Sequence, residues 1–125
     1  GIALLGLIHT YLLPAVSSEH LVMLVGSFGA MAVLVFSQPK APLAQPKNAI
    51  LGNTIGGIVG VTVVKVAAVA GLGHMMWLSA ALAVSLTIAL QELTTSAHPP
   101  GGATALLFVM IPPLHVLGYV YVACP

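Results

Sequence analysis

The sequence predicts an all-α fold, a polytopic bundle of transmembrane helices, on three observations. Hydrophobic residues make up 59% of the 125 residues and charged residues 4%, whereas about a quarter of the residues in a soluble domain are charged. Several apolar stretches approach the roughly 20 residues that an α-helix needs to cross a bilayer. Prolines, glycines and short polar strings divide the chain into five to six apolar segments, two of them short and interrupted.

The composition also excludes several classes of function. Three lysines, no arginine and two acidic residues leave no basic patch for nucleic acid. Cys124 is the only cysteine, and no Cys/His spacing resembles a metal site. The serines and acids show no arrangement typical of catalysis. We therefore expect no enzyme activity, no metal, no cofactor and no nucleic-acid partner.

The chain begins and ends within apolar runs. We therefore expect residues 1–125 to be a single transmembrane domain, trimmed at both ends. Two segments are long enough to span the membrane, Ala49 to Leu72 and Met76 to Leu93. Before them come Ile2 to Val16 and Leu21 to Phe36, the second interrupted by a Gly-Ser-Phe-Gly string.

The polar stretch between the second and third segments, Ser37 to Asn48, contains three prolines and two of the three lysines. The prolines predict an extended loop without helix, and the lysines place it on the cytoplasmic side. Near the other end, the run Ala103 to Ile111 is only about half a membrane thick as a helix.

The strings Gly29–Leu34 and Gly102–Leu107 share the pattern Gly-Ala-x-Ala-aliphatic-Leu. If they mark a repeat, each half has three crossings and the halves have opposite orientation, as in transporters with inverted repeats. The alternative is that glycine and alanine strings simply permit close helix packing.

The most specific string in the chain is His98-Pro99-Pro100-Gly101-Gly102-Ala103-Thr104. Two prolines fit immediately before or at the first turn of a helix, so the string marks a helix start. The N–H groups of Gly102, Ala103 and Thr104 would point out of that start together with the positive end of the helix dipole, which favours an anion site. The alternative is a helix start at the membrane surface, capped by water.

Two further places carry candidate binding residues. Ser27, Gly29 and Ala30 would form a second helix start of the same kind, with the Ser27 hydroxyl as an N-cap or a ligand, unless it bonds back to its own helix. Lys65 lies inside the third segment, where an ionisable group usually faces a cavity or a partner. Its long stem could instead carry the ammonium to the interface.

A stripe of small residues, Gly52, Gly56 and Gly60, predicts tight helix contact, either within the chain or in a homo-oligomer. Glu92 follows at the end of the fourth segment. It either terminates that helix at the interface or relays protons with His98.

Three strings, Gly26–Ala30, Ala41–Asn48 and above all His98–Leu107, resemble the HPP family of integral membrane proteins, which is named for the His-Pro-Pro motif. They occur in the family's order and cover roughly Gly26 to Leu107. The resemblance implies four or five membrane helices and, from plastid and cyanobacterial relatives, nitrite transport in a plasma or inner membrane or a chloroplast envelope.

The sequence thus predicts a channel or transporter for a small monovalent anion such as nitrite, embedded in the lipid bilayer. The binding site would lie near the midplane. Two alternatives stay open: a proton-linked transporter of a neutral or protonated solute, and a non-transporting membrane scaffold or sensor. The predicted substrate-binding residues are Ser27, Gly29, Ala30, Lys65, His98, Gly101, Gly102, Ala103 and Thr104.

Overall fold

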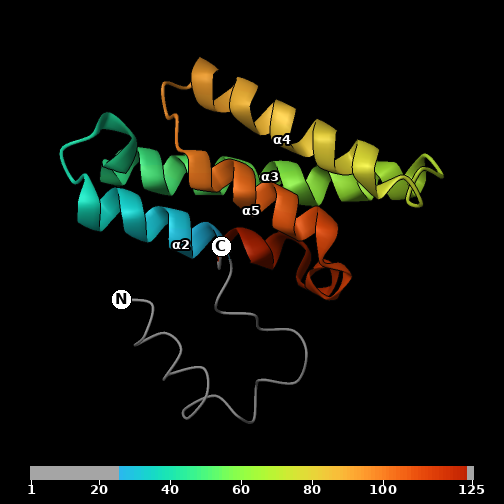
Figure 1. Ribbon diagram of the computed structural model, residues 1–125. Coiled ribbons are helices and arrows are strands. Elements are labelled where there is room, and N and C mark those ends of the chain that lie inside the picture. The colour runs from blue at the N-terminus through green and yellow to red at the C-terminus, as the bar shows by residue number, and fades with distance from the viewer. Residues whose placement is uncertain (1–25, 124–125) are drawn as a thin grey trace, which may run out of the picture.

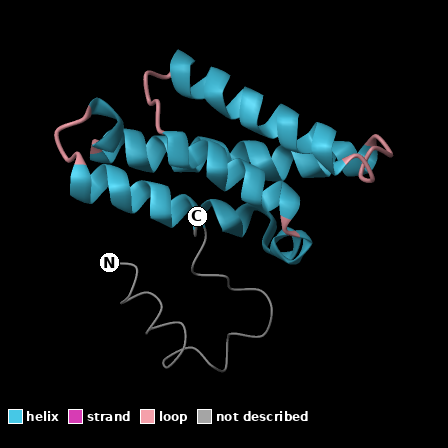
Figure 2. Cartoon of the chain, in the orientation of Figure 1, coloured by secondary structure: helices cyan, strands magenta, loops and turns pink. Residues whose placement is uncertain are grey.

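The computed structural model describes residues 26–123, and all regular structure in this range is helical (Figures 1 and 2). The predicted all-α class is confirmed. The first apolar segment and the start of the second lie outside the described residues. The elements are α2 (Gly26–Ala32), a π-helical turn η2 (Val33–Ser37), a 3-10 turn η3 (Pro42–Ala44), α3 (Pro46–Val69), α4 (Met76–Leu93), α5 (Pro99–Met110) and the 3-10 segment η4 (Pro112–Ala123).

The two long helices, α3 and α4, are long and apolar enough to cross a membrane. They are about 36 and 27 Å long at 1.5 Å per residue. The bounds of α4 are those predicted, but α3 begins and ends three residues before the predicted range. It begins early because Pro46 occupies the first turn, where its ring geometry suits a helix and no N–H is needed. It ends early because the chain turns at Gly71, which has a φ of 71°.

The predicted extended loop before α3 is wrong in part. Pro42 opens a 3-10 turn and Ala44 is buried. Asn48 Nδ2 donates hydrogen bonds to the carbonyls of Pro42, at 3.0 Å, and Ala97, at 3.3 Å. The loop is therefore folded against the connection between α4 and α5.

The short helix α5 has 12 residues, which makes it about 18 Å long, little more than half of a typical hydrocarbon core. It starts at Pro99, with His98 as its N-cap. The predicted short helix is confirmed, but Gly101 and Gly102 lie inside its first two turns rather than before it.

The glycine stripe of α3 packs against α5 within the same chain. A Cβ atom on Gly56 would overlap the Gly101 carbonyl, and one on Gly60 would come within 3.0 Å of the Ala105 carbonyl oxygen. The order of these contacts shows that α3 and α5 run parallel. The stripe therefore makes an intramolecular contact. A homo-oligomer stays a prediction, but the stripe no longer supports it.

The helix α2 packs against α5. In Figure 1 the two helices run in opposite directions. This opposite orientation is what an inverted repeat requires, although the long helix expected before α2 lies outside the described residues.

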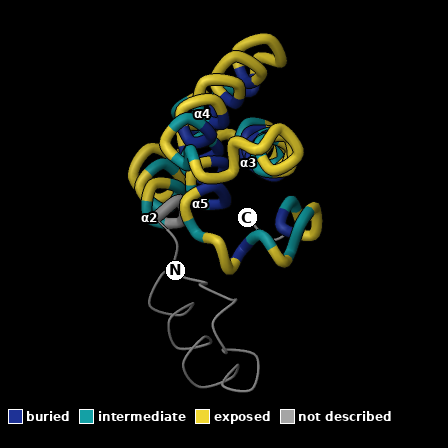
Figure 3. Tube along the Cα trace, turned by 90° about the vertical axis from the view of Figure 1, so that its right-hand side faces the viewer, coloured by how far each residue is buried: buried dark blue, intermediate teal, exposed yellow. Residues whose placement is uncertain are grey.

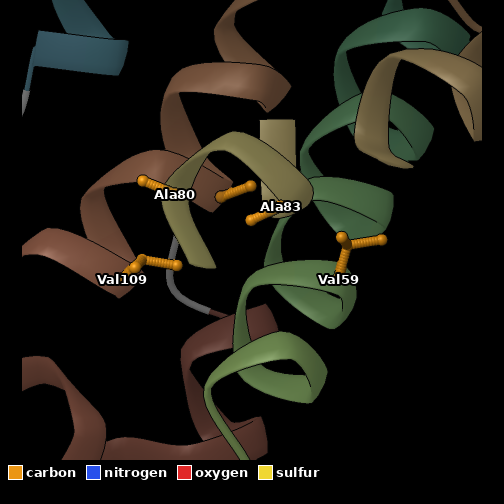
Figure 4. Close-up of a cluster of buried hydrophobic side chains, with 5 residues drawn as sticks. Val59, Ala80, Ala83 and Val109 are labelled. Atoms are coloured by element: carbon orange, nitrogen blue, oxygen red, sulfur yellow. The ribbon is translucent and has the colours of Figure 1, made fainter. Parts of the chain in front are cut away.

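The core between the long helices is built mostly from small side chains. Val59, Ala80, Ala83 and Val109, drawn in Figure 4, come from α3, α4 and α5 and cluster with Ala105. Many larger apolar side chains are exposed instead, and Figure 3 shows exposed residues along the outer side of α4. A lipid environment explains this surface, because hydrocarbon solvates apolar side chains while small residues allow the backbones to approach. Exposed examples from η2, α3, α4 and η4 are Val33, Phe36, Ile50, Val66, Val69, Trp77, Leu82, Ile88, Leu93 and Val116.

Candidate functional site

A cavity of about 570 Å³ lies between the C-terminal half of α4 and the first turns of α5. Leu43, from the loop before α3, contributes to its wall. Three predicted site residues, His98, Gly102 and Ala103, line the cavity. The full lining is Leu43, Val84, Ile88, Gln91, Glu92, Ala97, His98, Pro99, Gly102, Ala103 and Leu106.

The imidazole of His98 is completely buried and held in one orientation. Its Nδ1 lies 2.9 Å from the carbonyl oxygen of Leu43. A carbonyl oxygen only accepts hydrogen bonds, so Nδ1 carries the hydrogen and the neutral ring has its lone pair on Nε2. Within residues 29–123, whose side chains the structure describes, Nε2 is the one buried side-chain polar atom without a hydrogen-bond partner. Such an atom marks a place where a ligand or water is expected.

Gln91 holds the start of α5 in place. Its Nε2 donates to the carbonyl of Gly52 on α3 at 3.1 Å, and its Oε1 accepts from the backbone N–H of His98 at 3.1 Å. One buried amide thus joins α3, α4 and α5 beside the cavity. The sequence analysis did not single out Gln91. The available signal was an amide side chain in the last turn of an apolar helix.

The first-turn amides of α5 are almost all accounted for. Pro99 and Pro100 have no N–H, the N–H of His98 bonds to Gln91, and the N–H of Gly101 donates to the His98 carbonyl at 2.9 Å. Because the helix starts at Pro99, Ala103 lies within the ordinary hydrogen-bond ladder. The prediction that consecutive free amides point out of the helix at residues 102–104 is therefore wrong. What remains there is the positive end of the helix dipole.

Thr104 faces α3 rather than the cavity. Its buried hydroxyl lies 2.9 Å from Asn53 Oδ1 and 3.1 Å from the Pro100 carbonyl, and its own carbonyl accepts a hydrogen bond from the Tyr121 hydroxyl at 3.0 Å. Gly101 is buried against the Gly52 carbonyl. These two predicted site residues therefore hold α5 against its neighbours. The sequence analysis missed Asn53 and Tyr121.

The other predicted residues lie apart from His98. Gly29 and Ala30 belong to α2, whose described side chains do not line the cavity, and the side chain of Ser27 lies outside the description. Their role in binding stays a prediction. Lys65 is exposed, and its Nζ lies 4.3 Å from the ring centroid of Tyr119, a cation–π contact. It is about 14 Å along α3 from Gly56, at 1.5 Å per residue.

Glu92 is exposed and lines the same cavity as His98. These two residues are the titratable groups of the lining, and neither lysine nor arginine belongs to it. In residues 26–123, no three His, Cys, Asp or Glu side chains gather as metal ligands would.

The comparison with known proteins agrees with this architecture. The family described as HPP, transmembrane region, matches residues 1–125. The chain belongs to the HPP transmembrane family. The motif that names this family is here His98-Pro99-Pro100, so in this HPP chain the motif is the N-cap and first two residues of α5.

Two proteins of Dictyostelium discoideum, each named only as a transmembrane protein, are similar to this HPP chain. One is 48% identical over 110 residues, which cover 88% of this chain and 37% of the relative. The other is 42% identical over 125 residues, which cover 100% of this chain and 39% of the relative. The chain thus spans less than two fifths of either relative. No solved structure matches it.

Proposed function

We propose that this HPP domain moves a small monovalent anion, such as nitrite, across the membrane by way of the cavity beside His98. The observation that carries the proposal is the position of this cavity. It lies at the positive end of the α5 dipole, and a buried imidazole with an unpartnered nitrogen forms part of its wall. The dipole of a helix acts like a positive charge of roughly half an elementary charge at the helix start, and this charge attracts an anion.

The depth of this helix start supports a site inside the apolar slab. Gly52 of α3 packs against His98, the N-cap of α5. Gly52 is six residues, or about 9 Å, beyond the start of α3. The start of α5 is therefore about a quarter of the way along the longest described helix, and not at its end.

The lining also favours one class of anion. Gln91, Glu92 and His98 are its polar side chains, and the remaining lining residues are apolar or glycine. An entering ion exchanges its hydration shell for few polar groups and no permanent positive charge. That exchange costs least for weakly hydrated monovalent ions and most for sulfate or phosphate. Nitrite and nitrate fit this requirement.

The test is flux through the purified full-length protein in liposomes. Nitrite entry is compared with entry into protein-free liposomes at the same pH, since nitrous acid crosses lipid unaided. Equal rates in the two preparations would refute the proposal and favour a scaffold or sensor.

A variant pair locates the route. Ala103→Phe places a ring in the cavity and is expected to lower flux about tenfold or more, which corresponds to about 1.4 kcal/mol. Ala81→Phe makes the same change at an exposed position of α4 outside the cavity lining and is expected to leave flux near the wild-type value. Equal flux in the two folded variants would place the route elsewhere.

A further inference from the structure

We propose that His98 carries one proton for each anion that occupies the cavity, so that this domain moves an anion and a proton together. The inference rests on the proposed function and assigns the coupling to one ring nitrogen. It starts from the hydrogen bond between His98 Nδ1 and the Leu43 carbonyl, which is 2.9 Å long.

That bond decides what His98 can offer an anion. With the hydrogen on Nδ1, the neutral ring has an acceptor lone pair at Nε2. A lone pair cannot donate to an anion and repels it. Only the doubly protonated ring has an N–H at Nε2, so the ring becomes an anion ligand only when it takes up a proton. Nε2 itself has no exposed surface, so direct contact with an ion requires the atoms that cover it to move.

Burial then makes the two binding events depend on each other. The His98 ring is fully buried and Nε2 has no partner in the described residues, so an imidazolium there would be a buried charge without a counterion. An anion in the cavity meets neither lysine nor arginine in the lining. Each charge alone is disfavoured, and the two together neutralise each other. By linkage, binding of the anion and uptake of the proton by the ring should each strengthen the other.

The other charged groups around this ring are few. From α4, Glu92 lines the same cavity. Its carboxylate repels an anion, so its protonation also favours binding at low pH. The segment Gly26–Ala32 of α2 contains no titratable residue, and Lys47 lies exposed in the first turn of α3. Lys40 is exposed in the preceding loop. Glu92 is thus the one group that needs to be separated from His98 by experiment.

From α3, the neighbours of the first turns of α5 are Gly52, Asn53 and Gly56, which do not titrate. From η4, the Tyr121 hydroxyl is engaged at the Thr104 carbonyl, on the side of α5 that faces α3.

The experiment uses the full-length protein in liposomes with a trapped pH indicator and an inward nitrate gradient. Nitrate is the anion of a strong acid, so neutral acid does not cross the lipid as nitrous acid does. The expected result is internal acidification with nitrate entry, a proton-to-nitrate ratio near one, and a rate that an imposed potassium diffusion potential does not change. Nitrate entry that follows the imposed potential without proton movement overturns the inference and leaves the proposed function standing. No protein-dependent entry of nitrate or nitrite overturns both.

Two variants assign the proton. His98→Gln has no titratable ring and is expected to lose proton movement, with any remaining nitrate entry driven by the membrane potential. Glu92→Gln is expected to retain a ratio near one. If His98→Gln retains coupled proton movement, or if Glu92→Gln alone abolishes it, the proton is not on His98 and the assignment is wrong.

Discussion

Adding one methyl group at Gly56 is the sharpest test of how α5 is held. A Cβ atom there would overlap the backbone carbonyl of Gly101, and a backbone atom cannot rotate away as a flexible side chain does. The Gly56→Ala variant must therefore separate α3 from α5. Overpacking of this kind costs typically 1–3 kcal/mol, and we expect about 3 kcal/mol because backbone is displaced. The better helix propensity of alanine offsets roughly 1 kcal/mol, which leaves a net loss of about 2 kcal/mol.

The chain offers a matched control in α5 itself. Gly102 has nothing within 4 Å of the position that a Cβ would take. Gly102→Ala should therefore show the propensity gain alone and be about as stable as the wild type, or more stable by up to roughly 1 kcal/mol. Comparing the two variants removes the intrinsic effect of replacing a helical glycine by alanine.

The assay is unfolding of the full-length protein in one detergent, with all three proteins measured side by side. We expect the order Gly102→Ala, wild type, Gly56→Ala, from most to least stable. Nitrate flux should fall with Gly56→Ala, because the displaced first turns of α5 form the cavity wall. A Gly56→Ala protein as stable as Gly102→Ala would refute the close backbone contact and the parallel packing inferred from it.

Three more variants separate groups that hold the site from groups that lie apart from it. Gln91→Leu leaves the buried backbone N–H of His98 without a partner, at about 1–3 kcal/mol, and chemical denaturation should show a loss of that size. A loss below 0.5 kcal/mol, roughly the size of an ordinary surface change, would contradict the role of Gln91 in holding α5. Thr104→Val removes the hydrogen-bond donor to Asn53 and should lower stability by about 1–3 kcal/mol, whereas the folded protein should retain its nitrate flux. A stable variant that has lost its flux would return Thr104 to the binding site. Lys65→Met removes a cation that contacts the Tyr119 ring. Flux should stay within about twofold of the wild-type value, since exposed cation–π contacts contribute only about 0.5–1 kcal/mol. A tenfold loss of flux would place Lys65 on the route of the anion.

Much of the fold could be predicted because it depends on local chemistry. The bounds of α4 followed from an uninterrupted apolar run, and the short length of α5 followed from the proline pairs that flank it. The start of α3 was misplaced because Pro46 was taken as a residue that excludes helix, whereas at the first turn it favours one. The start of α5 was predicted only approximately, because two prolines fit either immediately before a helix or in its first turn, and the structure places both of them inside α5.

The site was predicted only in part, because it depends on contacts between segments far apart in the sequence. His98, Gly102 and Ala103 line the cavity, as a helix start beside the His-Pro-Pro motif suggested. Thr104 does not, because Asn53 draws its hydroxyl toward α3. Lys65 does not reach the site, because α5 packs beside the earlier turns of α3.

By itself, the sequence determined that this protein belongs in a membrane and is helical, because so few charged residues cannot cover a water-exposed surface and lipid requires every backbone group to be satisfied within the chain. It also determined that a short helix starts near the motif, since the conformation of proline is local. Only the tertiary structure decided which helix the glycine stripe meets and that Gln91 clamps the start of α5. It alone decided that Leu43 sets the tautomer of His98. These are pairings across tens of residues, and they depend on which helix faces meet in space rather than on the preferences of any one segment.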